Sequence, residues 1–200
     1  MKILAASDIH GDMNLIRNLA KKAEKENVDL VILCGDLTYG DNPPPGLIKS
    51  FTDKGKKVML VPGNHDTSAT IDFLSRLYNA INMHGYAYKM NDIGFFGFGS
   101  ASLGPFPVSE DEIYSKLKSN FKKIKDARKK VMITHAHPSG SMMENFSQFI
   151  TGSDAVRQAI DSLKPDILLC GHVHEASGIE EKIGKTLVIN AGKSGRIIEL

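Results

Sequence analysis

The sequence predicts an α/β fold, and three observations lead to it. Five short apolar runs are continuous rather than alternating, which suits strands buried on both faces. Segments with apolar residues at three- and four-residue steps lie between these runs and are typical of surface helices. Strand and helix therefore alternate, which indicates parallel βαβ units. The chain of 200 residues shows neither a repeat nor a linker, so we expect one domain over residues 1–200.

The elements follow in order along the chain. The expected strands cover residues 3–6, 30–34, 58–61, 131–133 and 167–170. Two helices are expected over 13–23 and 68–78. Another opens at Ser109, where a glutamate three residues later completes a capping box, and a last one covers 153–163 and must stop before Pro165. Closely spaced glycines in 86–99 and 177–199 indicate antiparallel hairpins.

Composition excludes several classes of protein. With 42% hydrophobic and 24% charged residues the chain is not disordered, and a net charge of +2 is too small to attract nucleic acid or membranes by itself. The N-terminal apolar run is too short for a signal peptide, so we expect a cytoplasmic protein. Cys34 and Cys170 each end an apolar run and are expected to be buried and reduced. The basic run 122–130 is expected to be a solvated helix end.

Polar residues that bind metals follow every predicted strand. In open α/β sheets the carboxyl ends of parallel strands meet at one rim, so these residues are expected to converge. In extended chain, residues two apart point the same way, so each Asp-x-His or His-x-His motif can present a pair of ligands. The seven oxygen and nitrogen ligands are too many for one tetrahedral zinc and suit two metals that share a carboxylate. They are Asp8, His10, Asp36, Asn64, His135, His172 and His174.

Taken together, these motifs resemble the signature of the calcineurin-like metallophosphoesterase superfamily, as a small, single-domain member of phosphodiesterase type. The resemblance spans residues 8–174. It implies a four-layer αββα sandwich of two mixed β-sheets flanked by helices, with the metal site at the carboxyl ends of the strands. It also implies that Asp36 bridges two metals, and that His65 is the general acid, oriented by Asp66. One metal would be held by Asp8, His10 and His174, the other by Asn64, His135 and His172.

The function expected from this site is hydrolysis of a small nucleotide-like or other organic phosphodiester. A metal-bridging hydroxide would attack phosphorus, and His65 as general acid would raise the rate about 10²- to 10⁴-fold. The site is expected to bind two divalent metal ions. Manganese is the favoured metal, and iron, zinc, nickel or magnesium stay open. The alternatives are a non-catalytic protein-binding scaffold of the same fold, a phosphomonoesterase or a nuclease. We expect no membrane or nucleic-acid partner, and a homodimer stays open.

A few residues keep uncertain roles. Tyr39 completes a Gly-Asp-x-x-Tyr pattern similar to that of purple acid phosphatases, in which the tyrosine binds ferric iron. Those enzymes lack the histidine of the first motif, so the presence of His10 favours the interpretation of Tyr39 as a loop residue. His137 either lines the site or is structural, and His84 is expected at the surface or in a turn. The segment 139–152 could be a lid, an apolar wall, a dimer contact or local core packing. With the proline-rich loop 41–46, it is expected to select the substrate.

Overall fold

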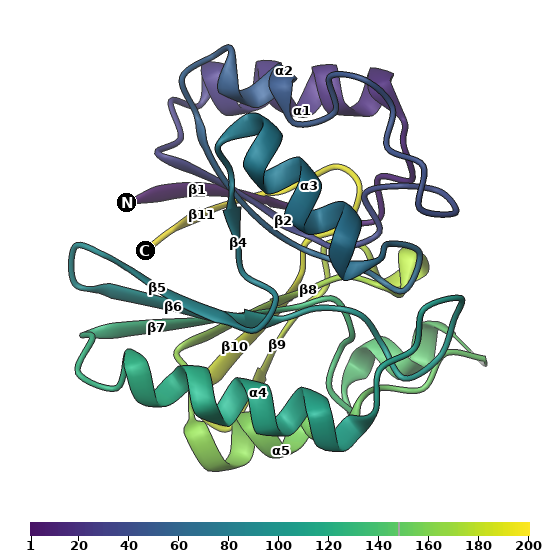
Figure 1. The fold of residues 1–200 in the computed structure, drawn as a ribbon. Helices are drawn as coiled ribbons and strands as arrows, with labels where there is room; N and C mark the ends of the chain where they lie inside the picture. Colours follow the sequence, from purple (N-terminus) through teal and green to yellow (C-terminus); the bar gives the residue numbers. More distant parts are fainter. Residues whose placement is uncertain (148) are drawn as a thin grey trace.

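The computed structural model describes residues 1–147 and 149–200 and contains two β-sheets packed face to face (Figure 1). The first sheet has the strand order β11-β1-β2-β3-β4 and the second the order β5-β6-β7-β8-β10-β9. Helices α1, α2 and α3 cover the outer face of the first sheet, and α4 and α5 cover the outer face of the second (Figure 1). The predicted αββα sandwich of two mixed sheets is therefore confirmed.

The first sheet is parallel apart from one edge strand. Its central strands β1, β2 and β3 run parallel, whereas β11 pairs antiparallel with β1. The strands are β1 (Lys2–Ala6), β2 (Leu30–Cys34), β3 (Lys57–Val61), β4 (Ile81–Asn82) and β11 (Arg196–Glu199). The helices on this sheet are α1 (Met13–Lys25), α2 (Lys49–Thr52) and α3 (Ser68–Tyr78). The sequence predicted neither β4 nor α2.

The second sheet is built around four parallel strands. The predicted hairpin β5–β6 forms, and β6 also pairs in parallel with β7. The hairpin β9–β10 forms at the other end, but β11 leaves it and joins the first sheet. The strands are β5 (Tyr86–Met90), β6 (Ile93–Phe98), β7 (Lys129–Thr134), β8 (Ile167–Cys170), β9 (Glu180–Ile183) and β10 (Thr186–Asn190). The helical segments are α4 (Glu110–Lys123), η1 (Met142–Phe146), α5 (Asp154–Leu163) and η2 (His174–Ala176).

Strand alternation explains why the apolar runs are continuous. In β2, Val31 and Leu33 pack toward the helices, while Ile32 and Cys34 pack between the two sheets. Both faces of such a strand are buried from solvent, so every position along it favours an apolar residue. Cys34 and Cys170 are free and buried, as predicted. Among the described residues no helix is long and apolar enough to cross a membrane.

One sequence interpretation needs correction. The basic run 122–130 is not a single helix end, because α4 stops at Lys123 while Lys129 and Lys130 already belong to β7. Only the lysines of the last turn of α4, Lys122 and Lys123, can complement the helix dipole.

The carboxyl ends of the parallel strands lie at the opposite edge of the molecule from the end of α4, on the right in Figure 1.

Candidate metal centre

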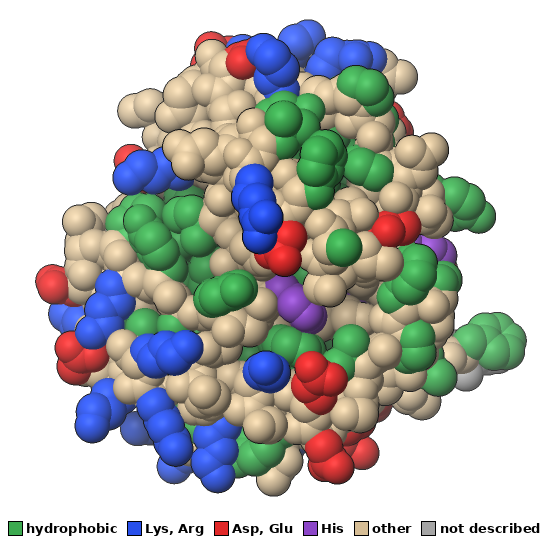
Figure 2. Space-filling view, in the orientation of Figure 1, with side chains coloured by type: hydrophobic (Ala, Val, Ile, Leu, Met, Phe, Trp, Pro, Cys, Tyr) green, Lys and Arg blue, Asp and Glu red, His purple; other side chains and the backbone are tan. Residues whose placement is uncertain are grey.

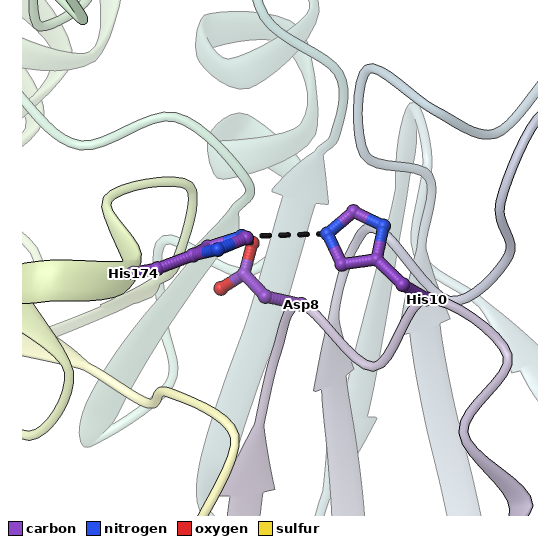
Figure 3. Close-up of side chains that lie close together, drawn as sticks. All are labelled: Asp8, His10 and His174. Atoms are coloured by element: carbon purple, nitrogen blue, oxygen red, sulfur yellow. Dashed lines mark hydrogen bonds and ion pairs between the residues drawn. The ribbon is translucent and has the colours of Figure 1, made fainter.

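The first cluster of predicted ligands forms beyond the ends of β1 and β8. The Nε2 atoms of His10 and His174 lie 3.3 Å apart, and His174 Nε2 lies 3.4 Å from Asp8 Oδ1. Figure 3 shows the two imidazole rings turned toward each other, with the carboxylate of Asp8 beside His174. These three side chains are the set that the resemblance assigns to one metal.

The backbone conformation differs from the extended chain that the sequence argument assumed. Asp8 and His10 have φ angles of 58° and 48°, and His172 has 74°, all in the left-handed region. Hydrogen bonds from Asp8 N to Gly35 O (3.0 Å) and from His10 N to Asp36 O (2.9 Å) hold this turn against the next loop. Left-handed backbone costs about 1–3 kcal/mol per residue outside glycine and clusters at functional sites. The ligand pairs therefore converge through tight turns and not through strand alternation.

The second cluster surrounds His135, which is fully buried. Its Nε2 lies 3.0 Å from Asn64 Oδ1, 3.1 Å from His172 Nδ1 and 3.5 Å from Asp36 Oδ2. Its Nδ1 lies 2.9 Å from the carbonyl oxygen of Cys34, which can only accept a hydrogen bond. In the neutral ring the proton therefore sits on Nδ1, and the lone pair of Nε2 is directed toward the other ligands.

Asp36 connects the two clusters. Its Oδ1 accepts a hydrogen bond from the amide of His65 (2.9 Å), which fixes the carboxylate. Its Oδ2 lies 3.6 Å from His10 Nε2 and 3.5 Å from His135 Nε2, one residue from each cluster. This is the position that a bridging carboxylate requires.

The donor set fits two divalent metal ions. Two oxygen acceptors, Asn64 Oδ1 and Asp36 Oδ2, and the ring nitrogen Nδ1 of His172 surround the single Nε2 of His135, and one proton on Nε2 cannot satisfy them all. Asp8, Asp36 and His135 are also buried and offer atoms within 4.8 Å of one another. Carboxylate, amide and imidazole ligands suit first-row divalent metals. Such a metal would accept the electron pairs of these ligand atoms, which the few ring protons present cannot satisfy.

The carboxylates and imidazoles of the site shift one another's pKa values. Burial opposes ionisation of Asp36, but the charge and hydrogen bond of His135 and the amide of His65 outweigh it and hold the pKa of Asp36 well below its usual range. Burial likewise disfavours protonated His135, but the Asp36 and Asp8 carboxylates raise the pKa of His135 to about 9. Burial and the charge of His135 lower the pKa of His172 to about 3. The metal-free cluster thus holds a proton on His135 that metal binding must displace.

The resemblance implies that Asp66 orients His65, and among the described residues the carboxylate of Asp66 makes its hydrogen bonds to groups other than the ring of His65. Its buried carboxylate instead accepts hydrogen bonds from Leu37 N (3.0 Å), Gly63 N (2.9 Å) and Thr38 N (2.8 Å). The hydroxyl of Thr38 donates a further bond of 2.7 Å. Asp66 therefore ties the loop after β2 to the loop after β3, and positions His65 only through the backbone.

The ligands open into a cavity of about 400 Å³. His65 lies at its rim, with its ring centroid 5.1 Å from that of His10. Besides His65 and ligands from both clusters, the lining includes three residues that are not ligand candidates: Tyr39, Ile150 and Glu175. His65 is therefore next to the place where a substrate would meet the metals.

The segment 100–107, which the sequence analysis did not connect with the site, supports Asn64 from behind. Phe106 N donates to Asn64 O (3.2 Å) and Ser100 N donates to Pro62 O (2.7 Å). Gly104 passes so close that a Cβ there would lie 2.3 Å from Asn64 Nδ2. Nothing in the sequence around Gly104 marks this contact, because it joins two loops that are distant along the chain.

The uncertain residues take separate positions. His137 is buried, burial lowers its pKa to about 4, and neither ring nitrogen has a hydrogen-bond partner among the described residues. It does not line the cavity, although its ring centroid lies 6.3 Å from that of His172. His84 lies in a turn, as predicted, and stacks on Phe98.

The segment 139–152 divides between core and surface. Met143 is buried against Cys170, which agrees with local core packing, whereas Phe149 is 88% exposed. Ile150 lines the cavity, which agrees with an apolar wall.

Comparison with known proteins places this arrangement in a family. The model for calcineurin-like phosphoesterases matches residues 1–176. A solved structure from Thermus thermophilus is 19% identical, with a TM-score of 0.77 over 96% of this chain and 90% of that chain. An archaeal phosphodiesterase is 21% identical, with a TM-score of 0.57 over 100% of both chains. A dimetal phosphatase from Danio rerio is 13% identical, with a TM-score of 0.65 over 96% of this chain and 87% of that chain. No curated protein matches the sequence. These structures share the fold, and the family match covers most of the chain including all seven ligand candidates; the chain therefore belongs to the calcineurin-like phosphoesterase family, a family of metal-dependent phosphoester hydrolases.

Proposed function

We propose that this protein is a phosphodiesterase that hydrolyses a small nucleotide-like or other organic phosphodiester. The observation that carries the proposal is the convergence of both ligand clusters on Asp36, with His65 at the rim of the same cavity. One metal would be held by Asp8, His10 and His174, the other by Asn64, His135 and His172, with manganese the preferred ion. When bound, two divalent ions lower the pKa of water and neutralise charge on the phosphoryl oxygens.

The side chains of this protein would then do three things. The ligands hold the phosphate beside His65. The two lie close together because Asp36, the carboxylate between the clusters, accepts a 2.9 Å hydrogen bond from the backbone amide of His65. As a water oxygen bonds to phosphorus and the P–O bond to the leaving group breaks, His65 donates its proton to the leaving oxygen, so that an alcohol and a phosphomonoester are released. Tyr39 and Ile150 supply part of the cavity wall that faces the substrate.

Two features favour a diester over a monoester or a nucleic acid. The residues described around the cavity include two carboxylates, Asp36 and Glu175, and no lysine or arginine, which suits a singly charged phosphate better than a doubly charged one. On the face drawn in Figure 2, Lys and Arg gather at the lower left and at the top, away from the right-hand edge where the strand ends lie. A nuclease would need basic side chains beside the site. The archaeal phosphodiesterase with the same fold agrees with a diester.

The proposal is tested by comparing bis(p-nitrophenyl) phosphate with p-nitrophenyl phosphate on the manganese-loaded protein. We expect the diester to be preferred, and His65→Ala to lower kcat by about 10²- to 10⁴-fold while two metals remain bound. Preference for the monoester would indicate a phosphomonoesterase. Two bound metals with no turnover of either ester would indicate the scaffold.

Because both cysteines are free and buried, the reducing cytoplasm remains our expected location.

A further inference from the structure

We propose that the cavity takes a phosphodiester that carries an aromatic ring on one ester arm, and that Tyr39 and Ile150 bind this ring. The inference rests on the proposed phosphodiesterase function and names the class of its substrate. Both side chains line the cavity of about 400 Å³, although neither is a ligand candidate.

Tyr39 is exposed, and the residues on both sides of it are held by hydrogen bonds. The residue is 73% exposed, and its ring lies nearly parallel to that of His65, with centroids 5.8 Å apart and planes 16° apart. On one side of it, the Thr38 hydroxyl donates to Asp66 (2.7 Å). On the other side, Asp41 N donates to His65 O (3.1 Å) and the Asp41 carboxylate accepts from Thr67 N (2.8 Å). An exposed tyrosine ring on a backbone held from both sides is available to stack on a planar group, and tyrosine loses little side-chain freedom on binding because it has few rotatable bonds.

Ile150 supplies a second apolar surface, and its segment is also tied down. Ile150 N donates to Ser147 Oγ (3.1 Å). Glu144 closes the segment, since its two carboxylate oxygens accept from Gly140 N (2.9 Å) and Gly152 N (2.7 Å). Phe149 next to Ile150 is 88% exposed but does not line the cavity, so Ile150 alone supplies the apolar surface from this segment. In Figure 2 apolar side chains project from the right-hand edge above and below a histidine, where the strand ends lie.

Charge at the rim defines the rest of the arm. Glu175 places a carboxylate in the cavity lining beside His174, while Lys193 acts on His174 electrostatically without lining the cavity. A carboxylate accepts hydrogen bonds from hydroxyl or amino groups and repels further phosphates. The arm is therefore an uncharged aromatic ring: a simple aryl group supplies the ring alone, whereas a nucleobase also supplies a hydrogen-bond donor for Glu175.

The test measures binding by calorimetry to the manganese-loaded protein, so it does not depend on turnover. The probes are monomethyl methylphosphonate, monomethyl phenylphosphonate and thymidine 5′-methylphosphonate, which place a methyl, an aryl and a nucleobase arm beside one charged phosphorus group. We expect the wild-type protein to bind at least one ring-bearing probe about 5-fold or more tighter than the methyl probe, as base stacking on one aromatic side chain predicts.

Variants assign that preference to residues. Tyr39→Ala is expected to bring the ratio of ring to methyl affinity close to one, whereas Tyr39→Phe keeps it. Tyr86→Ala is the matched control, because Tyr86 is 56% exposed on β5 and does not line the cavity. The ring-bearing probe that loses more affinity in Tyr39→Ala identifies an aryl or a nucleobase arm.

The inference is overturned if wild type binds no ring-bearing probe better than the methyl probe. It is also overturned if the preference survives both Tyr39→Ala and Ile150→Ala. A ring preference that depends on Tyr39 in a protein that hydrolyses no diester would instead contradict the proposed function and support the ring site.

Discussion

Replacing Gly104 with alanine is expected to weaken one of the two metal sites and leave the other intact. Gly104 has a φ of +124° and packs against the side chain of Asn64. A Cβ at this position would lie 2.3 Å from Asn64 Nδ2 and 2.8 Å from Asn64 Cβ. Asn64 Oδ1 lies 3.0 Å from His135 Nε2, so any movement of Asn64 reaches the cluster around His135 first.

The size of the effect follows from these distances. Moving the contact from 2.3 Å to at least 3.0 Å needs a shift of about 0.7 Å. Metal–ligand distances vary by only about 0.2 Å, so a displaced Asn64 would no longer be in position to ligate. We expect the affinity for one metal to fall about 10- to 100-fold, the loss that follows when support for a ligand is removed.

The assay titrates metal-stripped protein with manganese and follows bound metal by calorimetry. Gly184→Ala is the control, because Gly184 also has a positive φ of +59°, but a Cβ added there would meet no atom within 4 Å. It reports the backbone cost of adding a side chain without the contact to Asn64. Two manganese ions bound to Gly104→Ala with wild-type affinities would refute the supporting role of segment 100–107.

Three further predictions concern stability of the metal-free protein. Thr38→Val removes the hydroxyl that donates to Asp66 and is expected to lower the free energy of unfolding by about 1–3 kcal/mol in urea titrations; no loss would mean that the contact between the two loops does not matter. Burial lowers the pKa of His84 from 6.5 to about 4, so as the pH falls the unfolded chain binds a proton at this histidine before the folded protein does. The stability that neutral His84 contributes is complete above pH 6.5 and is lost as the pH falls toward 4. His84→Gln is therefore expected to reduce the loss of stability between pH 6.5 and pH 4, and an unchanged pH profile would contradict this, although the lowered pKa values of His137 and His172 keep part of the slope in every variant. Met143→Ala is expected to cost about 2–5 kcal/mol because Met143 is buried, whereas Phe149→Ala at an 88% exposed position stays within about 0.5 kcal/mol; equal effects would contradict the division of this segment into core and surface.

Sequence reasoning predicted the parts of the fold that depend on local pattern. The strand 30–34 follows from five apolar residues in a row, and the helix at Ser109 follows from a side chain that caps Glu112 N at 3.2 Å. The crossing of β11 to the first sheet could not be predicted, because pairing with β1 is decided by partners almost two hundred residues apart in the chain. The same holds for Gly104, whose role depends on a loop that it meets only after folding.

The convergence of the seven ligand candidates was predictable because each follows a buried strand, and parallel strands bring their carboxyl ends together. The reason given for the pairs was wrong, since Asp8 and His10 adopt left-handed turns. The hydrogen-bond partners of Asp66 could not be predicted either, because its buried carboxylate accepts from backbone amides of two loops and from the Thr38 hydroxyl. Chemistry could therefore be predicted from residue type and order, but hydrogen-bond partners could not.

The most direct test of the account is a titration of metal-stripped protein with manganese in which bound metal and hydrolysis of bis(p-nitrophenyl) phosphate are measured in the same samples. The account predicts that two ions bind, that turnover appears with them, and that Asp36→Asn, which alters the carboxylate facing both clusters, binds metal more weakly and loses activity. Failure to bind any metal, or turnover that does not depend on metal, would contradict it.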